Sequence, residues 1–151
     1  MKRITKALTI FAALTAIVCL SACTRNNGNI GKQFGQWKVT HITVDGQTDA
    51  NYHGNMFWSF QNSTVEMKYV EDNHETRNTF GNYRIDDNTL FITFPDASRP
   101  PLPGLGLKAE GENAIQIVRL TGSEMTLAYD TSPGDPDNGT AATVILQLRK
   151  W

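Results

Sequence analysis

Cysteine is the scarcest residue type in this chain. Its 151 residues include only two cysteines, Cys19 and Cys23, and both lie in the first 23 positions. The remainder of the chain therefore has no thiol for a disulfide bond or for a cysteine nucleophile. A domain formed by that remainder has to be stabilised by burial of apolar side chains. At this length, a domain buries roughly two-thirds of the surface that its unfolded chain exposes.

Clusters of basic residues are also missing. The chain has 14 basic and 15 acidic residues, and no cluster of lysines and arginines appears after Arg25. Binding to nucleic acid needs a basic face that displaces counterions from the phosphates. We therefore exclude nucleic acid as a partner.

Sequence patterns of catalytic and metal sites are absent as well. There is no G-x-S-x-G motif, and the three histidines, His41, His53 and His74, lack the close spacing of zinc ligands. Residues 135–139 resemble the start of a calcium loop, but the glycine comes at the fifth position and the twelfth residue is Leu146. We expect no metal, no cofactor and no enzymatic activity.

The N-terminus carries the pattern of an export signal. Lys2, Arg3 and Lys6 precede an uncharged, largely apolar stretch of 14 residues at positions 7–20. This is the arrangement of a signal peptide. The stretch is also shorter than the about 20 apolar residues that a permanent transmembrane helix requires.

The residues that follow, Leu20-Ser21-Ala22-Cys23, resemble the lipobox of bacterial lipoproteins. The resemblance implies that residues 1–22 are removed and that Cys23 becomes the acylated first residue, with palmitate among its acyl chains. Two or more such chains hold a protein stably on a membrane. The polar residues 24–29 predict a flexible tether over residues 23–33. The alternatives are an ordinary secretory signal with an incidental cysteine, or a buried amphipathic helix.

The predicted processing has consequences for charge and location. Loss of residues 1–22 removes three of the 14 basic residues and none of the 15 acidic ones, which leaves a net charge of −4. Thr24 stands where inner-membrane lipoproteins of well-studied Gram-negative bacteria carry an aspartate. The segment also lacks an acidic cluster resembling a surface-export signal. We therefore expect the periplasmic face of the outer membrane.

From Gln36 onward, apolar residues recur mainly at every second position, which is typical of half-buried strands. Polar turn residues separate the alternating stretches. The pattern predicts an all-β domain over residues 34–151 with about eight short antiparallel strands, at residues 37–42, 56–60, 65–69, 80–85, 90–94, 115–120, 125–129 and 144–148. An up-and-down barrel is favoured because closure removes both exposed edges of such a meander. A β-sandwich is the alternative.

The segment Gly35-Gln36-Trp37 resembles the G-x-W signature of the lipocalin family. Together with Gly81-Asn82-Tyr83, Asn88-Thr89-Leu90 and the late basic pair, it resembles the lipocalin-like domains of Bacteroidetes lipoproteins. The resemblance implies that Trp37 closes the base of the barrel, with Arg149 or Lys150 stacked on its ring. The T-D-Y motif and the terminal helix of classical lipocalins are missing, so the resemblance supports the fold more than any ligand class.

An eight-stranded barrel is just wide enough to be filled by side chains or to hold one small ligand. We expect a small apolar or amphipathic ligand. Alternation assigns nine side chains to the interior as ligand contacts: Val39, His41, Trp58, Phe60, Met67, Tyr69, Phe94, Leu127 and Leu146. A register shift of one residue would exchange each of them for its neighbours.

The alternative function is a protein-interaction module or structural accessory of an envelope complex, with a filled barrel and no ligand. Residues 95–113 are central to this choice, because long loops in compact domains are usually functional or disordered. The loop contains four of the six prolines and three leucines, Leu102, Leu105 and Leu107. These leucines form a lid over the barrel, present an apolar surface to a partner, or plug one end of the barrel.

The first prediction concerns Cys23. We expect mass spectrometry of the membrane fraction to find a mature chain that begins with an acylated Cys23. Replacement by serine removes the thiol that accepts the lipid, so Cys23→Ser is expected to lack the acyl mass. An unmodified sulfur, or a signal peptide that stays attached, contradicts the lipoprotein assignment.

Overall fold

The structure is a computed structural model that describes residues 31–96, 101–102, 105–131 and 141–151, and residues 32–151 form a compact unit. The predicted signal peptide, Cys23, nearly all of the predicted tether and the segment 135–139 lie outside the described residues.

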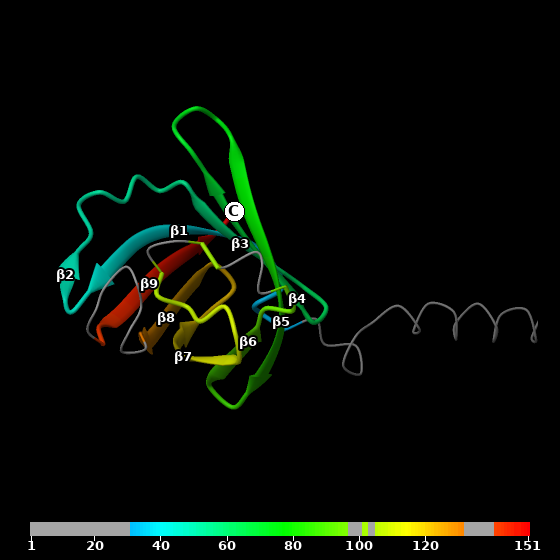
Figure 1. Cartoon of the computed structure of the whole chain (residues 1–151). Helices are drawn as coiled ribbons and strands as arrows, with labels where there is room; N and C mark the ends of the chain where they lie inside the picture. The colour runs from blue at the N-terminus through cyan, green and yellow to red at the C-terminus, as the bar shows by residue number, and fades with distance from the viewer. Residues whose placement is uncertain (1–30, 97–100, 103–104, 132–140) are drawn as a thin grey trace, which may run out of the picture. The chain divides into compact units, whose positions relative to one another are not determined.

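Nine antiparallel strands form one sheet (Figure 1). They are β1 (Gly35–Val44), β2 (Gln47–Thr48), β3 (Met56–Gln61), β4 (Thr64–Val70), β5 (Thr76–Asp86), β6 (Thr89–Thr93), β7 (Glu112–Leu120), β8 (Glu124–Asp130) and β9 (Thr143–Lys150). Neighbouring strands pair in the order β2-β1-β3-β4-β5-β6-β7-β8-β9, and β9 returns to pair with β1. Eight strands therefore close a barrel, and β2 lies beside the end of β1. The predicted barrel is confirmed and the sandwich alternative is wrong.

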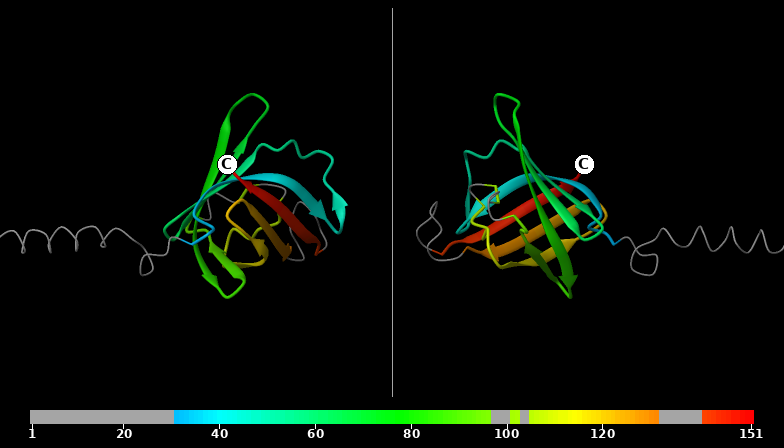
Figure 2. Two further views of the ribbon diagram at one scale, coloured as in Figure 1. Left: turned by 180° about the vertical axis from the view of Figure 1, so that it is seen from behind. Right: turned by 45° about the vertical axis from the view of Figure 1, so that its right-hand side comes forward.

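The two ends of the barrel differ in the length of their connections. At one end, the base, β1 begins, β9 ends, and short turns join β3 to β4, β5 to β6 and β7 to β8. At the other end, the mouth, lie the connections that follow β1, β4, β6 and β8. The hairpin of β4 and β5 extends beyond the rest of the mouth (Figure 1, Figure 2). The longer connections, where binding sites usually form, thus gather at one end.

A bulge in β1 changes which of its side chains enter the barrel. Val39 pairs with Leu148 of β9, but the next pair is His41 with Gln147, so the register shifts between Val39 and His41. Ile42 is therefore buried inside, and His41 is exposed. The prediction that His41 lines the interior is wrong, because strict alternation does not hold across a bulge.

Trp37 closes the base, as the G-x-W resemblance implied. Its ring is fully buried, and its Nε1 donates a hydrogen bond to the carbonyl oxygen of Gln33 at 2.7 Å. The ammonium of Lys150 lies 4.4 Å from the ring centroid and also donates to the carbonyl of Phe34. Gly35 has a φ of +106°, and a Cβ there would lie 3.0 Å from the Lys150 Nζ, so glycine suits this position.

The second prediction tests close packing of β5 on β6. A Cβ at Gly81 would lie 2.9 Å from the Cγ2 of Ile92 and 3.1 Å from the carbonyl oxygen of Thr93. We expect Gly81→Ala to lower the free energy of unfolding by about 1–3 kcal/mol, measured by urea denaturation. Gly122→Ala is the matched control, because a Cβ there meets nothing within 4 Å. Equal midpoints for the two variants would contradict the packing described.

Candidate functional site

Most of the barrel interior is filled by side chains. Six of the nine predicted ligand contacts have no exposed surface at all: Val39, Trp58, Phe60, Met67, Leu127 and Leu146. A side chain with no accessible surface has no water-sized space beside it. These six form a close-packed core, and they leave no room for a ligand against them in this structure.

The other three predicted contacts lie in different surroundings. Phe94 is 7% exposed and belongs to the core, whereas Tyr69 is half-buried at the mouth end of β4. His41 lies on the outer surface, as described above. Of the nine, only Tyr69 lines the cleft at the mouth.

Part of the loop between β6 and β7 enters the mouth as a plug. Leu102 and Leu105 are 4% and 0% exposed and belong to the core, and Leu107 packs against it. Of the three interpretations of these leucines, the structure favours the plug. Leucines that are buried in their own barrel do not offer an apolar surface to a partner.

Two inward-facing polar residues hold this loop in place. The hydroxyl of Tyr129 donates a hydrogen bond to the carbonyl oxygen of Leu105 at 2.7 Å. The side-chain amide of Asn113 accepts from the backbone nitrogen of Lys108 at 2.7 Å and donates to its carbonyl oxygen at 3.0 Å. Neither residue was predicted, because a polar side chain in a strand carries no local sign of the loop that it will bind.

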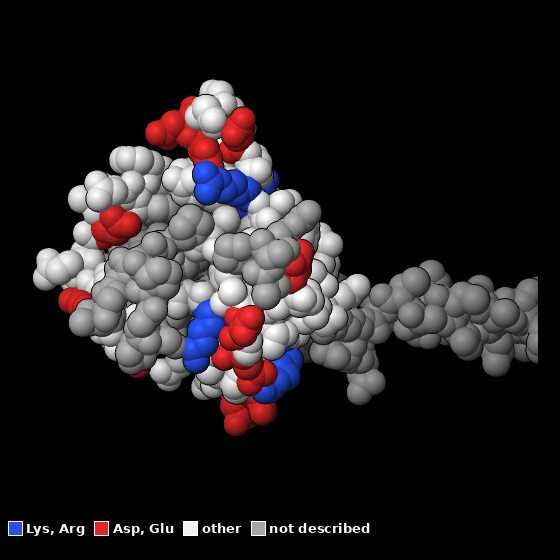
Figure 3. Space-filling model, viewed as in Figure 1, with Lys and Arg blue, Asp and Glu red and all other residues white. Residues whose placement is uncertain are grey.

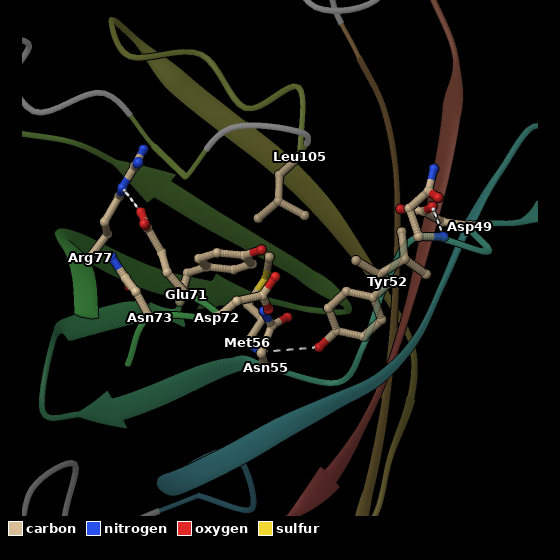
Figure 4. Close-up of a pocket in the computed structure, with 12 residues that line it drawn as sticks. Asp49, Tyr52, Asn55, Met56, Glu71, Asp72, Asn73, Arg77 and Leu105 are labelled. Atoms are coloured by element: carbon tan, nitrogen blue, oxygen red, sulfur yellow. Dashed lines mark hydrogen bonds and ion pairs between the residues drawn. The ribbon is translucent and has the colours of Figure 1, made fainter. Parts of the chain in front are cut away.

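A cleft of about 580 Å³ lies at the mouth, beside the plug (Figure 4). Its lining comes from the end of β1, the connection that leads to β3, the hairpin of β4 and β5, and the plug. The lining residues are Ile42, Asp49, Asn51, Tyr52, Asn55, Met56, Tyr69, Glu71, Asp72, Asn73, Arg77 and Leu105. Only Tyr69 and Leu105 were among the predicted site residues.

Tyr52 joins three segments of the cleft wall. Its hydroxyl donates a hydrogen bond to the carbonyl oxygen of Val39 at 2.8 Å and accepts one from the backbone nitrogen of Met56 at 3.2 Å. Burial, the largest effect, raises the pKa of Tyr52 from its ordinary value of 10.0 to about 12. The hydrogen bond from Met56 lowers this pKa, and the charge of Tyr69 raises it. Tyr52 thus ties the β1–β3 connection to the barrel in its neutral form.

Asn55 brings a buried acceptor to the cleft. Its Nδ2 donates a hydrogen bond to the carbonyl oxygen of Val70 at 2.8 Å. Its Oδ1 is buried and has no partner among the residues that the structure describes. An unpaired buried acceptor is unfavourable for the folded state.

The rim of the cleft is mainly acidic. Arg77 forms an ion pair with Glu71, which leaves the carboxylates of Asp49 and Asp72 on the rim. The Asp49 carboxylate accepts a hydrogen bond from the backbone nitrogen of Asn51 at 2.9 Å. Acidic side chains gather at the tip of the β4–β5 hairpin (Figure 3). The rim therefore favours polar or positively charged groups over anions.

Within the described part of the chain, no three or more histidine, cysteine, aspartate or glutamate side chains come together as metal ligands do. No helix among the described residues has the length and apolar character needed to cross a membrane.

Comparison with known proteins agrees with the observed fold. Residues 18–133 match the family described as lipocalin-like domain. A lipocalin-like protein from Bacteroides uniformis is similar in structure, with a TM-score of 0.63, 18% identity, and coverage of 80% of this chain and 100% of that one. A protein from Bacteroides eggerthii has a TM-score of 0.58, 19% identity, and coverage of 79% and 99%. A search of curated proteins gives no significant match.

The third prediction follows from the raised pKa of Tyr52. A raised pKa means that the folded state favours the protonated phenol, so this contribution to stability is complete below pH 10 and is lost as the pH rises towards about 12. We expect urea denaturation to show this loss for the wild type and a smaller one for Tyr52→Phe. The variant is also less stable at neutral pH by about 1–3 kcal/mol, because the Val39 carbonyl loses its donor.

Absorbance of the ionised phenol provides the control for this prediction. The chain has four tyrosines, and Tyr52→Phe is expected to remove a phenol that ionises at a pH of about 12. An unchanged titration at the alkaline end would contradict the burial of this hydroxyl.

Proposed function

This chain belongs to the lipocalin-like domain family, and on that premise we propose that it is a lipid-anchored envelope protein that binds a small amphipathic molecule at the mouth of its barrel. The proposal differs from the sequence-based expectation in one respect. The binding site lies at the mouth, above a packed core, instead of in the depth of the barrel.

The cleft is the observation that carries the proposal. Its volume of about 580 Å³ falls within the range of about 300–1,000 Å³ that is usual for small-molecule sites. Its apolar side is formed by Ile42, Met56 and Leu105, and its other side is polar. Small-molecule sites commonly combine an apolar wall with a few polar groups that orient the ligand.

The arrangement of the lining indicates how such a molecule would lie. An apolar portion would pack against the ring of Tyr69 and the small exposed parts of Ile42 and Met56. The carboxylates of Asp49 and Asp72 disfavour an anionic head group. A neutral or cationic amphipathic molecule therefore fits the cleft better than a fatty-acid anion.

The lipid anchor gives this binding a location. An acylated Cys23 would keep the barrel at a membrane, where amphipathic molecules accumulate. β1 begins at the base, so the cleft lies at the end of the barrel opposite to the start of β1. We place the protein on the periplasmic face of the outer membrane, on the sequence grounds of Thr24 and the missing acidic cluster.

A protein-interaction or structural role is the second candidate, and the packed interior favours it. A barrel with six fully buried inward side chains is stable without a ligand. Since Leu102 and Leu105 are buried in the plug, a partner protein would have to contact another part of the surface.

The fourth prediction distinguishes the two functions. Residues 24–151 are titrated with an uncharged fluorescent amphipathic probe, and we expect saturable binding at one site. Tyr69→Ala removes an aromatic wall of the cleft and is expected to weaken binding about tenfold, which corresponds to about 1.4 kcal/mol. The readout is probe fluorescence, and the same titration with a fatty-acid probe is expected to give weaker binding.

His41→Ala is the matched control for this titration, because His41 is exposed on the outer surface and does not line the cleft. Its affinity is expected to equal that of the wild type. Absence of saturable binding to the wild type would support the interaction role instead. Binding that Tyr69→Ala leaves unchanged would place the ligand elsewhere.

A further inference from the structure

The outer face of the barrel carries a row of basic and aromatic side chains. Arg149 of β9 pairs with Lys38 of β1, Lys38 with Phe57 of β3, and Phe57 with Lys68 of β4. These residues alternate with buried ones, so their side chains lie on the outside. With two exposed aromatic residues nearby, they form what we call the basic–aromatic wall: Phe34, Lys38, Phe57, Lys68, Arg149 and Trp151.

The aromatic part of the wall is exposed to solvent. Trp151 is 70% exposed and Phe34 is 41% exposed. Trp151 packs edge-on against Phe57, with ring centroids 5.5 Å apart. The Lys38 ammonium lies 5.2 Å from the Trp151 ring, and that of Lys68 lies 5.4 Å from the Phe57 ring. Cations that surround exposed aromatic rings are the combination by which proteins bind at membrane interfaces.

The positive charges of the wall are not neutralised by ion pairs. Among the described residues, the ion pairs involve Arg77, Arg84 and Arg119, and none involves Lys38, Lys68 or Arg149. Glu124 pairs with Arg149 along the strands, but its carboxylate binds Arg119 at 3.0 Å. One acid, Glu66, lies on the same face of β4. The wall thus has a surplus of positive charge on a mature chain whose predicted net charge is −4.

Two residues of the wall, Phe34 and Trp151, lie where the N-terminal segment joins the barrel. Phe34 directly precedes β1, and the backbone nitrogen of Trp151 donates a hydrogen bond to the carbonyl oxygen of Gln36 at 2.9 Å. Ten residues lie between Cys23 and Phe34, and the eleven extended steps from one to the other span at most about 40 Å. A lipid on Cys23 would therefore hold the wall close to the bilayer.

We infer that the basic–aromatic wall rests on a membrane surface that contains anionic phospholipids. Trp151 and Phe34 enter the head-group region, and the three cations lie against the lipid phosphates. An acidic protein would neutralise the cations, but it would not require the exposed indole. The inference extends the proposed function and rests on it in one respect. The predicted anchor brings the wall near the bilayer, whereas the side chains of the wall bind the lipids.

The fifth prediction tests the wall without the anchor. Residues 24–151 contain the whole compact unit, with all nine strands and the core, so this domain is expected to fold alone. We expect it to bind vesicles of phosphatidylcholine and phosphatidylglycerol, measured by cosedimentation. A cation near an anionic membrane contributes about a fivefold gain in affinity. The triple variant Lys38→Gln, Lys68→Gln, Arg149→Gln is therefore expected to bind about a hundredfold more weakly.

A second triple variant, Arg77→Gln, Arg84→Gln, Lys108→Gln, is the matched control. It changes the net charge equally but leaves the wall intact, and it is expected to bind as the wild type does. Circular dichroism establishes that both variants are folded. Equal loss of binding in the two triple variants would show that net charge alone acts, and it would overturn the inference.

Tryptophan fluorescence reports on insertion. Of the three tryptophans, Trp37 and Trp58 are fully buried, so a blue shift on addition of vesicles comes from Trp151. The shift is expected to disappear in Trp151→Phe. Binding to polyglutamate without binding to vesicles would assign the wall to an acidic polymer and overturn the membrane proposal. Since this domain lacks Cys23 and vesicle binding does not use the cleft, either result is independent of lipidation and ligand binding.

Discussion

The pairing of β9 with β1 is the interaction on which the rest of the structure depends. It removes the two edges that a meander of strands would otherwise expose, and it encloses one continuous apolar core. The same pairing brings the Lys150 ammonium over the ring of Trp37 and sets Arg149 beside Lys38. The closed base, the enclosed core and the basic–aromatic wall are thus consequences of one strand contact.

The two ends of the barrel differ in structure. Short turns and a buried tryptophan close the base, whereas the mouth is formed by longer connections that Tyr52, Asn113 and Tyr129 bind to the barrel. Because the plug fills part of the mouth, the remaining space is a cleft on one side of it. A rigid packed core below a wall of loops is a common way to hold a binding site, since the core fixes the loop ends.

The alternation of apolar and polar residues predicted the strands in which apolar residues recur. It gave no prediction, or a wrong one, for other parts of the chain. β5 begins at Thr76 instead of residue 80, because its first residues are polar and contribute through backbone pairing with β4. His41 was assigned to the interior because a bulge leaves no mark in the apolar pattern. The cleft was missed for a similar reason. Its lining comes largely from polar loop and turn residues, and the alternation of apolar residues in strands gives no information about these.

Local periodicity and short motifs were enough to predict the all-β class, the approximate strands and the G-x-W base. The tertiary structure alone decided that the interior is packed, that Leu102 and Leu105 plug the mouth, and that a cleft forms beside them. It also decided that cations far apart in the chain meet on one face. Such properties depend on strand register and on contacts between distant segments, which no local pattern encodes.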